Sequence, residues 1–304
     1  MFISKHKDAF GVEPVCRVLT GSGWQIAPGT YYAAVKRPPS ARAMRDAQIL
    51  AEIGRMRAQY EEVYGARKTW LELNRRGIPV ARCTVERVMR ENGLRGARRG
   101  RKVRTTIPGK GPGHERAADL IGRDFTAPAP SRRWVADFTH VATLAGTVYV
   151  AFVADIFSRM FTGWAAARHK RAKLVLDALD MALWHRDHGG HPVGAGLIHH
   201  SDAGSQYTSI AFTARLAAEG IVPSIGSVGD ALDNALMESA IGLYKTELIT
   251  RRGPWRDLAH VEMETAGYLH WFNHRRIHSA IGDVAPAEAE AAWYAARGGE
   301  GQDQ

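Results

Sequence analysis

The sequence predicts an α/β protein in which a mixed-sheet domain follows a small all-α domain of helix-turn-helix character. Alternating strand-like segments and segments of helical spacing succeed one another in the order βββαβαβα across residues 132–245, and this order is typical of a mixed sheet covered by helices. Three short helical segments separated by glycines precede them, in residues 43–94, as in helix-turn-helix modules.

Length and composition limit the class of protein. At 304 residues the chain is long enough for two domains, since domains have about 100–200 residues each. It contains no run of about 20 uncharged apolar residues and no apolar signal-peptide core, so we expect a cytoplasmic protein with no membrane partner. The two cysteines, Cys16 and Cys83, are too far apart for a metal knuckle, and we expect two buried thiols.

The chain begins with residues 1–42, a segment with little periodic pattern in its apolar residues, and the sequence indicates no role for it. We expect one short helix there, from Tyr31, ended by Pro38 and Pro39. The first helix of the 43–94 module has apolar residues at spacings of four, three and four. These residues are Ile49, Ile53, Met56 and Tyr60.

The second and third helices of this module cover residues 68–76 and the stretch that follows Pro79. Arg82 and Arg87 lie on the outward side of the third helix, which could therefore enter a DNA major groove. The alternative is an ordinary three-helix bundle whose exposed arginines are merely solvated.

Residues 95–127 form a predicted linker rich in basic residues, glycine and proline. From Arg95 to Lys110 it carries seven basic residues and no acid, in a chain with net charge +10 and a pI near 9.8. Such a segment cannot pack into a core, but it can lie along phosphates and release their counterions. We therefore expect DNA contacts from Arg98, Arg99 and Arg101, the alternative being a solvated linker.

The predicted sheet domain, residues 128–285, places three acidic residues on three elements, and residues 286–304 follow it as a helix and tail. Asp137 lies on the first strand, Asp202 follows a short apolar strand, and Glu238 comes 36 positions after Asp202 on a predicted helix. Lys245 is seven residues beyond Glu238, about 20° short of two helical turns, so both side chains share one helix face.

Three carboxylates at one end of a sheet would repel one another and take up protons. Hard divalent cations such as Mg²⁺ resolve this repulsion because they prefer oxygen ligands, and a pair of such ions supports in-line transfer at a phosphodiester. Taken singly, each acid has an ordinary explanation: Asp137 as a turn or cap residue, Asp202 as a helix-start residue and Glu238 as a surface helix acid.

Four strings of the sequence resemble DDE transposases of the third insertion-sequence family. They are WVADFT from Trp134, HSDAGSQYTS from His200, DNALMES from Asp233 and FNHRRIH from Phe272. The 35 residues between Asp202 and Glu238 match that family's spacing, and the resemblance covers nearly the whole chain. It implies an RNase H-like, retroviral-integrase-like catalytic core preceded by a helix-turn-helix domain.

By this resemblance, Asp137, Asp202 and Glu238 are the catalytic residues and ligands of two Mg²⁺ ions, for which Mn²⁺ can substitute. Lys245 matches a basic position that holds the terminal DNA phosphate, and the segment containing Asn273, Arg276 and His278 matches an element for DNA contact or for packing against the core. The sequence departs from the family pattern outside the ligand positions, at Ala136, Phe138, Ala203, Ser227 and Val228.

The implied function is transposition: DNA cleavage and strand transfer at the terminal inverted repeats of an insertion sequence, and integration into target DNA. Implied partners are double-stranded DNA, further copies of this chain, and an upstream-frame helix-turn-helix and leucine-zipper protein, free or fused. The setting would be the bacterial cytoplasm and nucleoid. Alternatives are a metal-dependent nuclease, an inactive DNA-binding relic of a transposase, and a zinc protein with histidine ligands. Zinc sites of the integrase type pair such histidines with nearby cysteines, which this sequence lacks.

Overall fold

The computed structural model describes most of the chain: residues 2–58, 61–98, 117–226 and 234–298. The chain divides into two compact units, Met1–Arg55 and Met56–Gln304, which are described separately below. Among the described helices, none is both long and apolar enough to cross a membrane.

The first unit contains three helices where the sequence predicted only one. They are α1 (Phe2–Phe10), α2 (Val12–Gly21) and α3 (Pro28–Lys36), followed by most of α4 (Ala41–Arg57). Helix α3 starts three residues before Tyr31, at Pro28, a residue favoured in a first helical turn. The segment has little visible pattern because its core is small, consisting of Ile3, Val12, Val15, Cys16 and Tyr31.

The apolar faces predicted for the 43–94 helices are buried in the structure. Ile49, Ile53 and Met56 on α4 are at most 2% exposed, whereas Tyr60 lies outside the described residues. Helices α5 (Ala66–Arg75) and α6 (Arg82–Glu91) belong to the second unit, and α6 buries Val85, Val88 and Met89. The expectation for Cys83 was wrong, because this thiol is exposed on α6.

The second unit contains the predicted mixed sheet, which has five strands in the order β3-β2-β1-β4-β5. The antiparallel meander is β1 (Arg133–Thr143), β2 (Gly146–Asp155) and β3 (Phe161–Ala167), and β4 (Ile198–Ser201) and β5 (Val222–Ile225) continue the sheet parallel to β1. The α/β prediction with a mixed sheet is thus confirmed.

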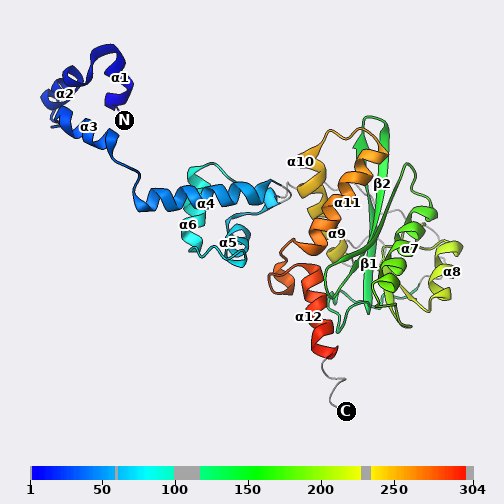
Figure 1. The fold of residues 1–304 in the computed structure, drawn as a ribbon. Coiled ribbons are helices and arrows are strands. Elements are labelled where there is room, and N and C mark those ends of the chain that lie inside the picture. The colour runs from blue at the N-terminus through cyan, green and yellow to red at the C-terminus, as the bar shows by residue number, and fades with distance from the viewer. Residues whose placement is uncertain (1, 59–60, 99–116, 227–233, 299–304) are drawn as a thin grey trace. The chain divides into compact units, whose positions relative to one another are not determined.

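Helices cover both faces of the sheet (Figure 1). Helices α7 (Ala172–His188) and α8 (Ile210–Ala218) pack on the face that carries Trp134 and Ala136. Helices α9 (Ala235–Tyr244) and α11 (Leu258–His274) pack on the other face, which carries Val135. Because side chains alternate along a strand, Asp137 belongs to the α9 side.

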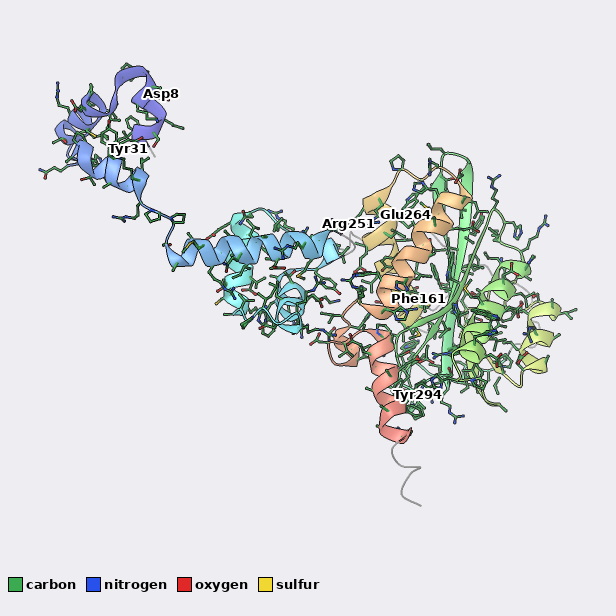
Figure 2. All side chains as sticks on the ribbon, in the orientation of Figure 1. Asp8, Tyr31, Phe161, Arg251, Glu264 and Tyr294 are labelled. Carbon is green, nitrogen blue, oxygen red and sulfur yellow. The ribbon has the colours of Figure 1, made fainter. Side chains whose placement is uncertain are left out.

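Aromatic rings fill the layer between the sheet and α11. Phe161, labelled in Figure 2, lies at the start of β3. Its ring contacts Phe152 of β2 and Phe272 of α11, at centroid distances of 5.2 and 4.7 Å. Trp184 on α7 is a large apolar residue whose place on a sheet-covering helix favours burial, yet it is exposed and stacks on His188.

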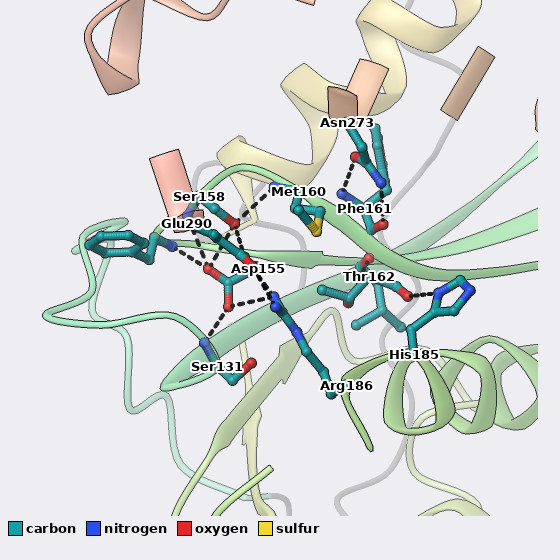
Figure 3. A network of polar contacts seen from close by, with 12 residues as sticks. Ser131, Asp155, Ser158, Met160, Phe161, Thr162, His185, Arg186, Asn273 and Glu290 are labelled. Carbon is teal, nitrogen blue, oxygen red and sulfur yellow. Dashed lines mark hydrogen bonds and ion pairs between the residues drawn. The ribbon is translucent and has the colours of Figure 1, made fainter. Parts of the chain in front are cut away.

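The last helix, α12 (Pro286–Gly298), is tied to the sheet by buried charges (Figure 3). Glu290 of α12 accepts two hydrogen bonds from Arg186 of α7, at 2.6 and 2.7 Å. Asp155, at the end of β2, lies 3.7 Å from the same guanidinium and accepts hydrogen bonds from the backbone nitrogens of Ser131, Phe157 and Ser158. Helix α12 therefore packs as part of the sheet domain.

Candidate functional site

Two of the three predicted acids are brought together by strand register. Strand β4 pairs with β1 in parallel, and its last residue, Ser201, lies opposite Ala136. The next position on each strand is Asp137 on β1 and Asp202 just beyond β4. Because neighbouring strands lie about 5 Å apart, the backbone positions of Asp137 and Asp202 are adjacent.

Glu238 reaches the same region from α9, and Asn234 connects this helix to β1. The Asn234 amide donates a hydrogen bond of 3.1 Å to the carbonyl of Ala136, the residue before Asp137. The carbonyl of Asn234 accepts the Glu238 backbone N–H at 3.0 Å. In the sequence Asn234 is only one letter of the string that begins at Asp233. Asparagine is a common helix N-cap, but here its side chain bonds the strand instead of the helix.

The charges of the site act on Asp137 most strongly. Burial first, and then the negative charges of Asp202 and, less strongly, Glu238, raise the pKa of the Asp137 carboxyl to about 8. The Phe138 backbone N–H, 2.7 Å from Asp137 Oδ1, and the Lys245 ammonium act in the opposite direction. All three predicted acids and the predicted cation are therefore close enough to interact.

Asp202 and Lys245 form the more open side of the site. Asp202 is exposed as a residue, yet enough protein surrounds its carboxyl that burial raises its pKa, while the Gly204 N–H and His200 lower it. Lys245 is partly buried, which lowers its pKa, while the charge of Asp137 opposes that shift. Lys245 begins a π-helical turn, Lys245–Ile249, directly after α9, and such turns are frequent at functional sites.

Tyr207 is a further polar group beside the acids. Its side chain is buried and its hydroxyl has no hydrogen-bond partner among the described residues. Burial raises the pKa of this phenol strongly, and the charges of Asp137 and Asp202 add to the effect. The only sequence signal for Tyr207 is its place in the string that follows Asp202.

The donor set fits a hard divalent cation, because it consists of carboxylate oxygens whose mutual repulsion a cation relieves. Within the described ranges, no three His, Cys, Asp or Glu side chains are already gathered at metal-binding distance. Binding a cation between Asp137, Asp202 and Glu238 thus requires side-chain rotation, for which the exposed surface of Asp202 and the partial exposure of Glu238 leave room.

The arginines predicted to contact DNA differ in their surroundings. On α6, Arg82 pairs with Glu86 at 2.8 Å and Arg87 with Glu91 at 3.0 Å, one helical turn apart in each case. Arg98 is exposed just after the helices. Arg99 and Arg101 lie outside the described residues.

The C-terminal residues predicted for DNA contact or packing all make interior contacts. Asn273 hydrogen-bonds both the N–H and the carbonyl of Phe161, at 3.0 and 2.8 Å. Arg276 is 4% exposed and paired with Glu247, and His278 lies against Arg276 and the Phe272 ring. Of the two roles left open by the sequence, these contacts favour packing, since a buried guanidinium is not free to reach a phosphate.

Three protein-family models match the chain. The integrase core domain matches residues 127–231, a second integrase core domain model matches residues 219–286, and an HTH-like domain matches residues 44–102. Together these models cover the helical module and the sheet domain.

Several relatives match over most of their length. A Mycobacterium tuberculosis protein assigned as the transposase of insertion sequence element IS986/IS6110 is 53% identical over 90% of this chain and 97% of that protein. The transposase for insertion sequence element IS629 from Shigella sonnei is 45% identical over 98% of this chain and 97% of its own. Transposase InsF for insertion sequence IS3A from Escherichia coli is 33% identical over 82% and 83%, respectively.

Among solved structures, the HTLV-2 integrase catalytic core domain in complex with magnesium aligns with 54% of this chain and 98% of its own, with 16% identity and a TM-score of 0.41. The family itself is established by the sequence relatives and the domain models. This chain belongs to the DDE transposases of the IS3 family, with an integrase core domain preceded by an HTH-like domain.

Proposed function

We propose that this transposase cuts DNA at the ends of its insertion sequence and joins the freed ends to target DNA in a Mg²⁺-dependent reaction. The observation that carries this proposal is the parallel register of β1 and β4, which places Asp137 and Asp202 at neighbouring positions of the sheet, beside the strand residue that Asn234 at the start of the Glu238 helix bonds. The charges of Asp202 and Glu238 both raise the pKa of Asp137, which lies on the central strand β1, and the charge of Lys245 lowers it.

Asp137, Asp202 and Glu238 would hold two Mg²⁺ ions, with Mn²⁺ as a substitute in vitro. Ions bound there would stabilise negative charge on the reacting phosphate and lower the pKa of an attacking oxygen nucleophile. Apart from the acids, the chain supplies orientation: the Asn234 amide holds the Glu238 helix against β1, and the Lys245 ammonium can bind a terminal phosphate beside Asp137.

The reaction would consist of two in-line substitutions at phosphorus. Water attacks the phosphodiester at the element's end, the P–O3′ bond breaks, and a 3′-OH is released. That hydroxyl then attacks a target phosphodiester, forming a new P–O bond and releasing the target's 3′ oxygen, with no covalent protein intermediate. Lys245 would keep the terminal phosphate in place so that the attacking oxygen remains in line.

A labelled DNA fragment carrying one end of the element, incubated with target DNA and Mg²⁺, tests the proposal. We expect both a cleaved end and a longer, joined product. Cleavage without joining would favour the metal-dependent nuclease, and retained DNA binding with neither product would favour an inactive relic.

We further propose that α6 and the basic linker bind double-stranded DNA. Neutralising Arg82 and Arg87, or Arg98, Arg99 and Arg101, should weaken binding and reduce the slope of log affinity against log salt, since each lost phosphate contact lowers that slope by about one. A salt titration by fluorescence anisotropy measures the slope.

The matched control is Arg76→Gln. Arg76 is paired with Glu72 one turn away on the neighbouring helix α5, so the substitution removes one arginine charge outside the proposed groove helix and should leave the slope nearly unchanged. An unaltered slope in the Arg82 and Arg87 variant would remove α6 from the DNA interface.

An upstream-frame protein with its own helix-turn-helix and leucine zipper, free or fused to this chain, would supply recognition of the terminal inverted repeats. Several copies of the chain would then assemble on DNA at the bacterial nucleoid. We expect the isolated chain to bind a terminal repeat at least about tenfold more weakly than the fused product, a factor that linking two binding modules readily provides. Equal affinities in a mobility-shift titration would argue against this partner.

A further inference from the structure

We infer that the buried ion pair between Arg276 and Glu247 is a positioning device, which holds the π-helical turn so that Lys245 faces the carboxylate site. This inference rests on the proposed function, because Lys245 is the residue whose position it explains. It also gives a role to the C-terminal string that begins at Phe272, which DNA contact does not explain.

The pair has the geometry of a directional clamp. Arg276 donates two hydrogen bonds to the Glu247 carboxylate, from Nε to Oε2 at 2.8 Å and from Nη2 to Oε1 at 2.5 Å. The Tyr268 hydroxyl donates a third, to Oε2 at 2.9 Å. Both charged residues are about 5% exposed or less, and two parallel hydrogen bonds fix orientation as well as distance.

Glu247 lies inside the turn that begins with Lys245. In that turn Glu247 and Leu248 are buried, whereas the Lys245 side chain, two residues earlier, interacts with the charge of Asp137. A π-helical turn is rare and departs from the regular helix that precedes it. A tertiary contact on its inner side therefore determines where the residues on its outer side point.

The other end of the clamp is anchored to the sheet and to α5. Three residues before Arg276, the Asn273 amide hydrogen-bonds the backbone of Phe161 at the start of β3 (Figure 3). The next residue after Arg276 is Ile277. Its carbonyl accepts a hydrogen bond from the Lys68 ammonium at 2.7 Å, and its N–H donates one to the Tyr64 hydroxyl at 2.9 Å. Arg276 thus holds Glu247 in a fixed relation to the sheet that carries Asp137.

Stability alone does not explain such a pair. Replacing a buried ion pair with apolar side chains of similar volume is often neutral or even stabilising, whereas removing one partner leaves an uncompensated charge. An apolar pair would fill the same space between the turn and the Phe272 segment, but it would not fix the orientation of the turn.

The test uses the full chain with Glu247→Leu and Arg276→Met combined, which fills the volume and leaves no buried charge. We expect thermal unfolding and DNA binding close to wild type, amide hydrogen exchange across residues 241–249 accelerated about tenfold, and strand transfer reduced about tenfold or more. Arg276→Lys keeps the charge but not the two parallel bonds, and should lose part of the activity.

Two further variants separate positioning from a general structural role. Adding Lys245→Ala to the double variant should cause little further loss, because both changes remove the same placed cation. The control removes the exposed pair that joins α5 to the chain beyond Arg276, by Arg67→Gln with Asp283→Asn, and should alter neither exchange nor strand transfer.

Wild-type exchange rates and strand transfer in a folded double variant would overturn the inference while leaving the proposed function intact. Losses that add fully to those of Lys245→Ala would overturn it as well. If wild-type protein joined no DNA, the proposed function would fail, and the exchange rates of residues 241–249 would still decide whether the pair positions the turn.

Discussion

Replacing Asp137 or Asp202 with Asn, or Glu238 with Gln, is expected to abolish both end cleavage and strand joining, lowering each rate by about 10³-fold or more. Each substitution removes an oxygen charge from a set of three that would hold the metal ions in common. Because both steps use the same site, neither product should persist when one carboxylate is lost. The measurement is the appearance of cleaved and joined products from a labelled end fragment with Mg²⁺.

Two further variants calibrate this result. Lys245→Ala should reduce the rates less, by about 10–10²-fold, because it removes one charged contact to the phosphate and leaves the carboxylates in place. Asp187→Asn removes a carboxylate that is 72% exposed at the end of α7, on the opposite face of the sheet from α9, and should leave both products unchanged.

The substitutions must leave the protein folded and bound to DNA for the result to report on chemistry. The charges of Asp202 and Glu238 both disfavour the charged form of Asp137, so neutral side chains of the same shape should not destabilise the domain. Cleavage or joining that survives any one of the three substitutions, or that proceeds without a divalent cation, would contradict the proposed site.

The sheet domain was predictable because its sequence pattern and its packing have the same cause. Strands β1 to β3 alternate between two helix-covered faces, so Val135 and Ala136 enter different cores, and that alternation is visible in the sequence. Asp202 was placed at a strand end because the apolar residues Leu197 and Ile198 lead into the short strand before it, and the parallel register of that strand with β1 then puts Asp202 beside Asp137.

The contacts that complete the site were not predictable, because they join side chains that are distant in sequence. The Asn234 amide donates a hydrogen bond to a carbonyl 98 positions away. Arg276 pairs with Glu247, which lies in a π-helical turn that no local sequence pattern indicates. Hydrogen-bond partners of this kind depend on the assembled fold, whereas a periodic pattern reports only which face of an element is apolar.

The N-terminal helices and Trp184 illustrate a second limit. Helices α1 to α3 are only nine or ten residues long and bury few residues, so each has few turns in which an apolar period can show. Trp184 is large and apolar, yet it is exposed, with its ring stacked on His188 of the same helix. In both cases the local side-chain pattern says little about burial.

Asp137→Asn is expected to make the cation-free protein more stable than wild type, by an amount that depends on pH. The pKa of Asp137 is raised from 3.8 to about 8, first by burial and then by Asp202. Between these two values the folded protein therefore holds a proton that the unfolded chain releases. Wild-type stability conferred by this group falls as pH rises through that window, and the asparagine variant does not share the fall.

The stability gain of Asp137→Asn over wild type should consequently be absent near pH 3.8, grow as pH rises, and level off above pH 8. Effects of other titrating groups cancel because each comparison is made at one pH. Thermal unfolding in chelator across this range measures the difference, which should reach several degrees. Asp202→Asn should change stability in the same direction, since burial raises the pKa of that carboxyl too.

A divalent cation should remove the advantage of the variant. Mg²⁺ that binds the folded wild-type site stabilises it by mass action, and Asp137→Asn, lacking one ligand, should gain much less. The two unfolding temperatures are therefore expected to converge as Mg²⁺ is added at pH 8, while Asp187→Asn follows wild type throughout. If the stability difference between Asp137→Asn and wild type did not change with pH or with Mg²⁺, then Asp137 would neither interact with the charges of Asp202 and Glu238 nor bind the cation with them.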